Sequence, residues 1–128
     1  IFGLSDSSDH LIPSIIDKLA RGETNIELKT DGNESRSYLH VKDLVDALWL
    51  MRDTERLVLN IGSPFRHSVR QVVNMIVTSF PSRVSLTYGK IKGLTTPELS
   101  TEISEQLFNW PSGHNPQSIS SLFSTSNV

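Results

Sequence analysis

Residues 31–50, DGNESRSYLHVKDLVDALWL, constrain the fold more than any other stretch of the chain. The Asp31-Gly32 pair is typical of a turn, because glycine adopts positive φ easily and an Asp carboxylate accepts hydrogen bonds from nearby amides. Residues 37–41 have the aromatic and β-branched content of a strand. From Val41 onward the apolar spacing becomes helical, which predicts one apolar helix face. That face consists of Val41, Leu44, Val45, Leu48 and Trp49.

Arg36 lies where the turn enters the predicted strand. A guanidinium held at the end of a packed element can form a bidentate pair with a phosphate or a carboxylate. The alternative is a surface arginine that pairs with Glu34 or Asp43. The residues alone leave both interpretations of Arg36 open.

Strand and helix patterns alternate along the rest of the chain. Apolar spacing predicts helices over residues 11–21, 68–80 and 100–108 and a last helix around residues 119–123. Ser68 and Gln71 have the spacing of a capping box. Short strands are predicted over residues 26–28, 57–62 and 83–87, and a loop over residues 88–97.

This alternation predicts the α/β or α+β class. The predicted strands are short and too few for a doubly wound sheet. We therefore expect a partial layer that needs another domain packed against it.

Composition excludes several classes of protein. The length of 128 residues suits one domain, and 12 basic against 14 acidic residues give a net charge of −2. This balance gives no electrostatic case for nucleic acid or anionic membrane. The lack of cysteine rules out disulfides and fits a reducing, cytoplasmic location. No apolar run approaches the ~18 residues of a membrane span.

The first residues, Ile-Phe-Gly-Leu, have no charged segment and no long apolar core, so they do not form a signal peptide. The sequence also starts without Met. We expect the chain to be a fragment that begins within an element.

Known catalytic motifs are missing from the sequence. The four histidines are widely spaced, which argues against a zinc site. None of the motifs G-x-S-x-G, G-x-G-x-x-G and G-x-x-x-x-G-K-[ST] occurs. Asp43 and Asp46 fall in the first turns of a predicted helix, where carboxylates favour its positive end, so we expect structural roles. The remaining candidates are polar residues at element ends, where α/β folds place ligand contacts.

Several motifs follow one another in a characteristic order. A match to R-x-[YFW]-x-[HY]-V-x-D is formed by Arg36, Tyr38, His40, Val41 and Asp43, and residues 10–13 match [HK]-L-I-P. Further along, Asn60 and Gly62 match the motif Y-N-[IL]-G. A later helix that ends in a sequence like W-x-P is matched by Ile103, Leu107, Trp110 and Pro111. Leu59 and Asn109 depart from these motifs. The chain resembles the extended short-chain dehydrogenase/reductase family, which includes the NAD-dependent sugar-nucleotide epimerases and dehydratases.

The resemblance covers nearly the whole chain but only the C-terminal, substrate-binding portion of the family. It implies an α/β fold with short strands alternating with helices, as in the α+β-like small domain attached to a Rossmann-type domain. Residues 1–123 would form this substrate-binding domain or fragment, and residues 124–128 a flexible tail. The N-terminal, NAD-binding Rossmann domain would be absent from this chain.

The resemblance also implies polar contacts to a substrate. Arg36 would pair with the diphosphate of a nucleotide sugar, and Asn60 would hydrogen-bond the same region. The second basic contact, usually an arginine in the family, would fall to Lys90 or Lys92. His40 is expected to pack or bond locally.

Apolar contacts follow from the same resemblance. Leu11 and Ile12 would line the groove for the base or the backbone of the ligand. Leu28 would join them, although an ordinary position in the core explains this leucine about equally well.

In such proteins this portion binds the nucleotide-diphosphate sugar, while the other domain holds NAD(P) and the catalytic residues. We expect no catalytic, cofactor-binding or metal-binding residue in this chain, which alone would neither bind NAD nor turn over substrate. The parent would be an epimerase, dehydratase, decarboxylase or reductase. Its partners would be the nucleotide sugar, the missing Rossmann domain and, in a homodimer, a second copy, with neither nucleic acid nor membrane.

Two other interpretations stay open. The chain is consistent with a non-catalytic module, derived from this family, that binds a nucleotide or a protein. It is also consistent with an interaction surface made from uncovered apolar faces. An upstream segment with a glycine-rich turn and a Y-x-x-x-K pair would favour the enzyme.

Overall fold

The computed structural model of the chain describes residues 1–3, 5–55, 58–111 and 118–119. Within these ranges the elements are α1 (Leu11–Ala20), β1 (Asn25–Thr30), β2 (Ser35–Ser37), α2 (Val41–Leu50), β3 (Arg66–Ser68), α3 (Val69–Thr78), β4 (Ser85–Ile91) and α4 (Glu102–Phe108). Their mixed helices and strands, with a small parallel sheet, confirm the predicted α/β class. The helix expected around residues 119–123 and the tail at residues 124–128 lie outside the described part, apart from Ile119.

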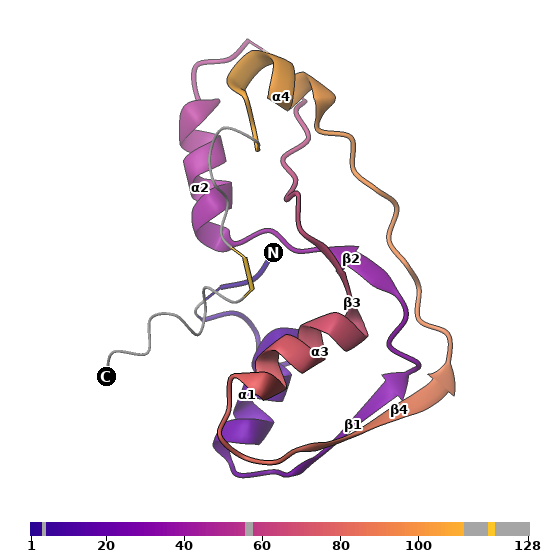
Figure 1. Cartoon of the computed structure of the whole chain (residues 1–128). Helices are drawn as coiled ribbons and strands as arrows, with labels where there is room; N and C mark the ends of the chain where they lie inside the picture. The colour runs from indigo at the N-terminus through magenta and orange to yellow at the C-terminus, as the bar shows by residue number, and fades with distance from the viewer. Residues whose placement is uncertain (4, 56–57, 112–117, 120–128) are drawn as a thin grey trace.

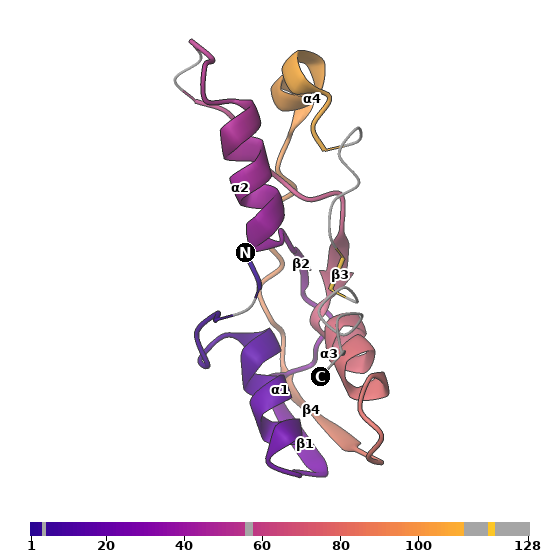
Figure 2. The same ribbon diagram turned by 90° about the vertical axis from the view of Figure 1, so that its left-hand side faces the viewer.

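The chain is elongated and forms two packed groups, which Figures 1 and 2 show from two sides. One group contains α1, α3, β1 and β4, and the other contains α2 and α4. The short strands β2 and β3 connect the two groups. Among the described residues, no helix has both the length and the apolar character that crossing a membrane requires.

Helix α1 agrees with the prediction from apolar spacing. It begins after His10, which has extended backbone angles, and buries Ile12, Ile15 and Leu19. Its end at Arg21 is followed by Gly22, whose φ of 80° is the left-handed conformation that terminates many helices.

Strands β1 and β4 pair in parallel, with Asn25 opposite Ser85 and Leu28 opposite Tyr88. The prediction of a loop from residue 88 was wrong for its first four residues, because β4 continues to Ile91. Gly89 makes this pairing possible: a Cβ there would lie 2.0 Å from the carbonyl oxygen of Lys29. The glycine that suggested a loop therefore allows close backbone approach within a sheet.

Helix α3 has the predicted capping box. The amide of Gln71 donates to Oγ of Ser68 at 3.2 Å, and the amide of Ser68 donates to Oε1 of Gln71 at 2.8 Å. The helix packs beside α1. Together with Ile26 of β1, their apolar side chains form the first core, which includes Val72, Val73 and Ile76.

The strand predicted over residues 37–41 was wrong in position. The observed β2 covers Ser35–Ser37 and pairs antiparallel with β3, with Arg36 opposite His67. Beyond it, only an isolated parallel bridge joins His40 to Phe2. The strand cannot continue because His40 is already the N-cap of α2, where its Nδ1 accepts from the amide of Lys42 at 3.1 Å. This contact confirms the expected local role of His40.

The helix predicted from Val41 onward is observed as α2, but of its predicted apolar face Leu44 alone packs against a core of the described chain. Val45 and Trp49 are 57% and 70% exposed, and Val41 and Leu48 are exposed as well. The helix instead buries Asp43 and Ala47. Ala47 packs in the second core with Leu39, Met51 and Trp110, so the small residue faces inward and an apolar surface remains outside.

The strand predicted over residues 57–62 is not observed in its described part, residues 58–62. Val58 is 79% exposed, although Leu59 and Ile61 pack against the second core. A strand needs a neighbour for its backbone groups, and no described strand lies beside this segment. Helix α4 holds the segment instead: the buried hydroxyl of Ser104 donates to the Asn60 carbonyl oxygen at 2.6 Å.

Candidate functional site

A cavity of about 330 Å³ lies between the start of α1 and the strand β2, and we call it the Arg36 cavity. Its wall on the α1 side is formed by His10, Leu11 and Ile12. Its wall on the β2 side is formed by Arg36, Ser37 and Tyr38. The structure thus brings together three residues that the resemblance implicates in substrate binding, namely Arg36, Leu11 and Ile12.

Arg36 is exposed, and its guanidinium forms no hydrogen bond or ion pair with any described residue. Glu34, one of the alternative partners, is buried and accepts instead from Oγ1 of Thr30 at 2.6 Å. The backbone of Arg36 is fixed by pairing with β3. A guanidinium on a fixed backbone with no partner in the described chain is suited to an anionic ligand.

The N-terminus of α1 lies at this cavity. The first amides of a helix have no partner within it, and the helix dipole places partial positive charge there. Leu11 and Ile12 supply the first of these amides, while Pro13 has none to supply. The cavity therefore combines a cation, a helix N-terminus and apolar side chains.

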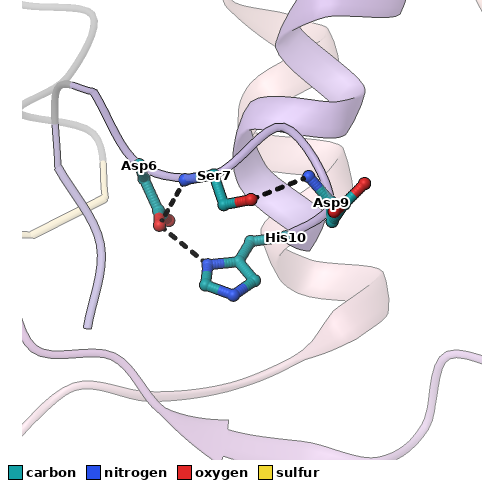
Figure 3. Close-up of polar contacts among 4 residues, drawn as sticks. All are labelled: Asp6, Ser7, Asp9 and His10. Carbon is teal, nitrogen blue, oxygen red and sulfur yellow. Dashed lines mark hydrogen bonds and ion pairs between the residues drawn. The ribbon is translucent and has the colours of Figure 1, made fainter.

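His10 and Asp6 border the same cavity, and sequence analysis did not single them out as a pair. Nδ1 of His10 donates to Oδ1 of Asp6 at 2.7 Å, and the same oxygen accepts from the amide of Ser7 at 2.8 Å (Figure 3). The amide of Asp9 also donates to Oγ of Ser7. The His10 side chain does not cap α1. Its hydrogen bond to Asp6 holds the imidazole against the preceding loop instead.

Tyr38 also lines this cavity, although sequence analysis did not predict it as a site residue. It is only 9% exposed, and its hydroxyl forms no hydrogen bond within the described chain. Burial raises the pKa of this phenol, and the nearby Arg36 guanidinium partly opposes the shift. The hydroxyl therefore stays protonated at neutral pH. Both Tyr38 and His10 belong to matched motifs, so the motifs contained the signal even though single residues did not stand out.

Asn60 lies away from the Arg36 cavity. It lines a different cavity, of about 230 Å³, with Val58 and Ser100. Its side-chain amide donates to the carbonyl oxygen of Ser100 at 2.8 Å. In this arrangement the Asn60 side chain fixes a loop contact.

The two candidate lysines are also outside the Arg36 cavity. Lys92 lines a cavity of about 320 Å³ with Asp31 and Glu34. Lys90 is exposed on β4. The coulombic effect of Lys92 helps to lower the pKa of Asp31, although the main cause is a hydrogen bond from the backbone of Asn33.

Leu28 does not line the Arg36 cavity either. It is half-buried in β1 and packs against the first core. Metal binding has no support within the described ranges, where no three His, Asp or Glu side chains converge.

Solved structures share this fold over nearly the whole chain. A structure of TunA, an NAD-dependent NDP-hexosamine 5,6-dehydratase, aligns with 96% of this chain and 40% of its own, at a TM-score of 0.78 and 20% identity. MoeE5 in complex with UDP-glucose and NAD aligns with 97% of this chain and 42% of its own, at a TM-score of 0.75 and 25% identity. The fold is thus found in Rossmann-type short-chain dehydrogenase/reductase enzymes that act on nucleotide sugars.

Sequence comparison gives the same class. The model of the NAD dependent epimerase/dehydratase family matches residues 1–62. A dTDP-4-dehydro-6-deoxy-D-allose reductase of Streptomyces bikiniensis is 32% identical over 94 residues, which are 71% of this chain and 28% of that enzyme. The chain therefore belongs to the NAD-dependent epimerase/dehydratase family, and it spans under a third of the length of this relative.

Proposed function

We propose that this chain is the nucleotide-sugar-binding portion of an NAD-dependent sugar-nucleotide epimerase, dehydratase or related reductase of the cytoplasm. The observation that carries the proposal is the Arg36 cavity, where Arg36, whose guanidinium has no partner among the described residues, and the start of α1 line the same space. NAD(P) and the catalytic residues belong to a further domain. Without that domain the chain is inactive.

The chemistry of the cavity matches a nucleoside diphosphate. A guanidinium binds phosphate oxygens in a bidentate geometry, and helix amides donate to the same anion. Leu11 and Ile12 offer apolar surface for the base beside these polar groups. The cavity volume of about 330 Å³ lies at the lower end of the range for small-molecule sites, about 300–1,000 Å³.

The other predicted contacts require the ligand to extend beyond this cavity or the loops to close. Asn60 would have to exchange its bond to Ser100 for one to the ligand. Lys90 or Lys92 would contact the diphosphate only by reaching out from the end of β4. We retain these residues and Leu28 as secondary parts of the proposal.

A further domain is supported by the outer side of α2, which is apolar and which the described residues leave largely exposed. Val45, Leu48 and Trp49 are each more than half exposed on this helix. The neighbouring residues 58–61 form no ladder with any described strand. The exposed apolar face of α2 and the unpaired backbone of residues 58–61 lie close together. A sheet from another domain could cover both. We propose that the cofactor-binding Rossmann domain covers them.

The test is calorimetric titration of the full-length protein with UDP-, dTDP-, GDP- and CDP-sugars. We expect one of these ligands to bind, and we expect Arg36→Ala to weaken it by about 1.5–3 kcal/mol, the range for a charged hydrogen bond. Lys18→Ala, which removes a half-buried basic residue from the last turn of α1, at the opposite end of this helix from the cavity, serves as the control. Equal affinity of wild type and Arg36→Ala would remove Arg36 from the site.

A second candidate function is a non-catalytic module that binds a nucleotide. The Arg36 cavity favours it, because a cation beside a helix N-terminus suits a nucleotide whether or not chemistry follows. Turnover of a nucleotide sugar with NAD(P) by the full-length protein would exclude it. Binding without turnover would support it.

A further inference from the structure

A second cavity, of about 350 Å³, adjoins the Arg36 cavity, and we call it the Gly3 cavity. The two cavities share four lining residues, which are Ile1, Phe2, Asp6 and His10. The Gly3 cavity is otherwise lined by Gly3, Ser5 and Val41, so it extends from the shared residues toward the start of α2. A ligand that occupies both cavities therefore passes the Asp6–His10 pair.

His10 is held on one side of its ring and open on the other. Its Nδ1 bonds Oδ1 of Asp6 at 2.7 Å, and the Asp6 side chain is only 18% exposed. The His10 side chain is 63% exposed, and its Nε2 has no hydrogen-bond partner among the described residues. A carboxylate only accepts hydrogen bonds, so the proton of the neutral imidazole lies on Nδ1 and Nε2 is an acceptor.

The Gly3 cavity is a suitable place for the sugar of the ligand. The proposed function places the diphosphate at Arg36 and the base on Leu11 and Ile12, which do not line the Gly3 cavity. The sugar is attached to the other end of the diphosphate, so it extends away from these apolar residues. Val41, on the wall of the Gly3 cavity, is the first residue of α2, whose outer face we propose to be covered by the cofactor-binding domain. The sugar would thus lie on the side where NAD(P) reacts with it.

We propose that His10, oriented by Asp6, is a specificity-determining residue whose Nε2 accepts a hydrogen bond from a hydroxyl group of the sugar in the Gly3 cavity. This inference rests on the proposed function, because it takes the ligand to be a nucleotide sugar. A hydroxyl group donates one hydrogen bond, which matches the single acceptor at Nε2. A site that binds a substrate hydroxyl in this way discriminates against an analogue that lacks it.

The test compares two ligands of the full-length protein that differ only in the sugar. One is whichever of UDP-, dTDP-, GDP- and CDP-glucose binds, and the other is the methyl ester of the same nucleoside diphosphate. Both diphosphates are esterified at both ends and carry the same charge, but the methyl ester has no sugar hydroxyl. Both ligands are titrated by calorimetry at about pH 8, at the upper end of the range in which imidazoles ordinarily gain a proton.

His10→Asn is the main variant. An asparagine amide lies where Nδ1 lies and can keep the bond to Asp6, but it places no acceptor at the position of Nε2. We expect it to bind the nucleotide sugar about fivefold more weakly than wild type, the effect of one ordinary hydrogen bond, and the methyl ester equally well. His10→Gln, whose longer amide reaches the position of Nε2, should recover most of the affinity for the sugar. A purely structural role of His10 would weaken both ligands in parallel.

Val41→Phe tests the place of the sugar independently. Val41 is 39% exposed and lines the Gly3 cavity, so a larger side chain at this position reduces the space in the cavity. We expect the nucleotide sugar to bind about tenfold more weakly, because the sugar would be overpacked against the larger side chain. Binding of the methyl ester should be unchanged, which also shows that the variant is folded.

The outcomes distinguish this inference from the proposed function. If none of the four nucleotide sugars binds, or if Arg36→Ala binds as well as wild type, the proposed function fails and the inference fails with it. If Arg36→Ala is weak but His10→Asn keeps the full affinity for the nucleotide sugar, only the role of His10 is overturned. Full affinity of Val41→Phe for the nucleotide sugar would move the sugar out of the Gly3 cavity.

Discussion

The indole Nε1 of Trp110 donates a buried hydrogen bond to the carbonyl oxygen of Gly62 at 3.1 Å. The two residues are 48 positions apart, and the bond ties the end of α4 to the segment that follows Asn60. Trp110 is almost completely buried and belongs to the second core with Ala47 and Met51. This one side chain therefore joins α2, α4 and residues 58–62.

Trp110→Phe should destabilise the chain by about 1–3 kcal/mol, because the Gly62 carbonyl oxygen would lose its buried donor. Urea denaturation followed by circular dichroism measures this change. Gln106→Ala, at an exposed position of α4, should change stability by no more than about 0.5 kcal/mol. Equal stability of the two variants would show that water replaces the indole.

Ser68→Ala should cost about 1 kcal/mol, since it removes the hydroxyl that accepts from the Gln71 amide at the start of α3. Ser68→Asp keeps an acceptor at this position and should retain most of the stability. Thermal denaturation of the two variants checks the cap. If Ser68→Asp is as unstable as Ser68→Ala, the capping bond contributes little.

Tyr38→Phe should raise the stability of the ligand-free chain by about 1 kcal/mol, because it removes a buried hydroxyl with no partner in the described chain. The effect should grow above about pH 10, the ordinary pKa of a phenol. Burial raises the pKa of Tyr38, so in alkali the unfolded chain loses this proton first, and stability falls as the pH rises. The Tyr38→Phe variant has no phenol proton at this position, so its stability does not fall in this way.

Denaturation of wild type and Tyr38→Phe at neutral and alkaline pH provides the measurement. Tyr88→Phe is the matched variant, because the Tyr88 hydroxyl is also buried with no partner among the described residues and burial also raises its pKa. A lower stability of Tyr38→Phe at neutral pH would mean that the hydroxyl has a partner, such as a fixed water.

Val45→Lys should destabilise the full-length protein by about 2 kcal/mol if another domain covers the outer face of α2, since a charge would then be buried. Leu94→Lys makes the same change at a position that is 82% exposed and away from α2, and it should have little effect. Scanning calorimetry compares the two. Identical melting of both variants would contradict the proposed covering of α2.

Local signals predicted several elements well. The helix at residues 11–21, the capping box at Ser68 and the strand around Ile26 were all confirmed. Each depends on neighbours within a few residues: apolar spacing, a polar cap and a terminating glycine. The motif around Arg36 likewise predicted the family.

Non-local contacts explain the errors. Apolar spacing predicted α2 itself, but the second core takes Ala47 and Leu44 from this helix, because they lie on the side where Leu39, Met51 and Trp110 gather. Residues 58–62 have the composition of a strand but no described strand to pair with. Gly89 was interpreted as a loop residue because its close approach to Lys29 depends on a strand about 60 residues earlier in the chain.

The candidate site also depends partly on local sequence and partly on tertiary packing. The sequence by itself determined the residue types, including the cation Arg36 and the apolar pair Leu11 and Ile12, through motifs that are local. Only the tertiary structure decided which side chains share a cavity. It placed His10, Asp6 and Tyr38 beside Arg36 and left Lys92 in another cavity, because the start of α1 and the end of β2, which are far apart along the chain, line the same cavity.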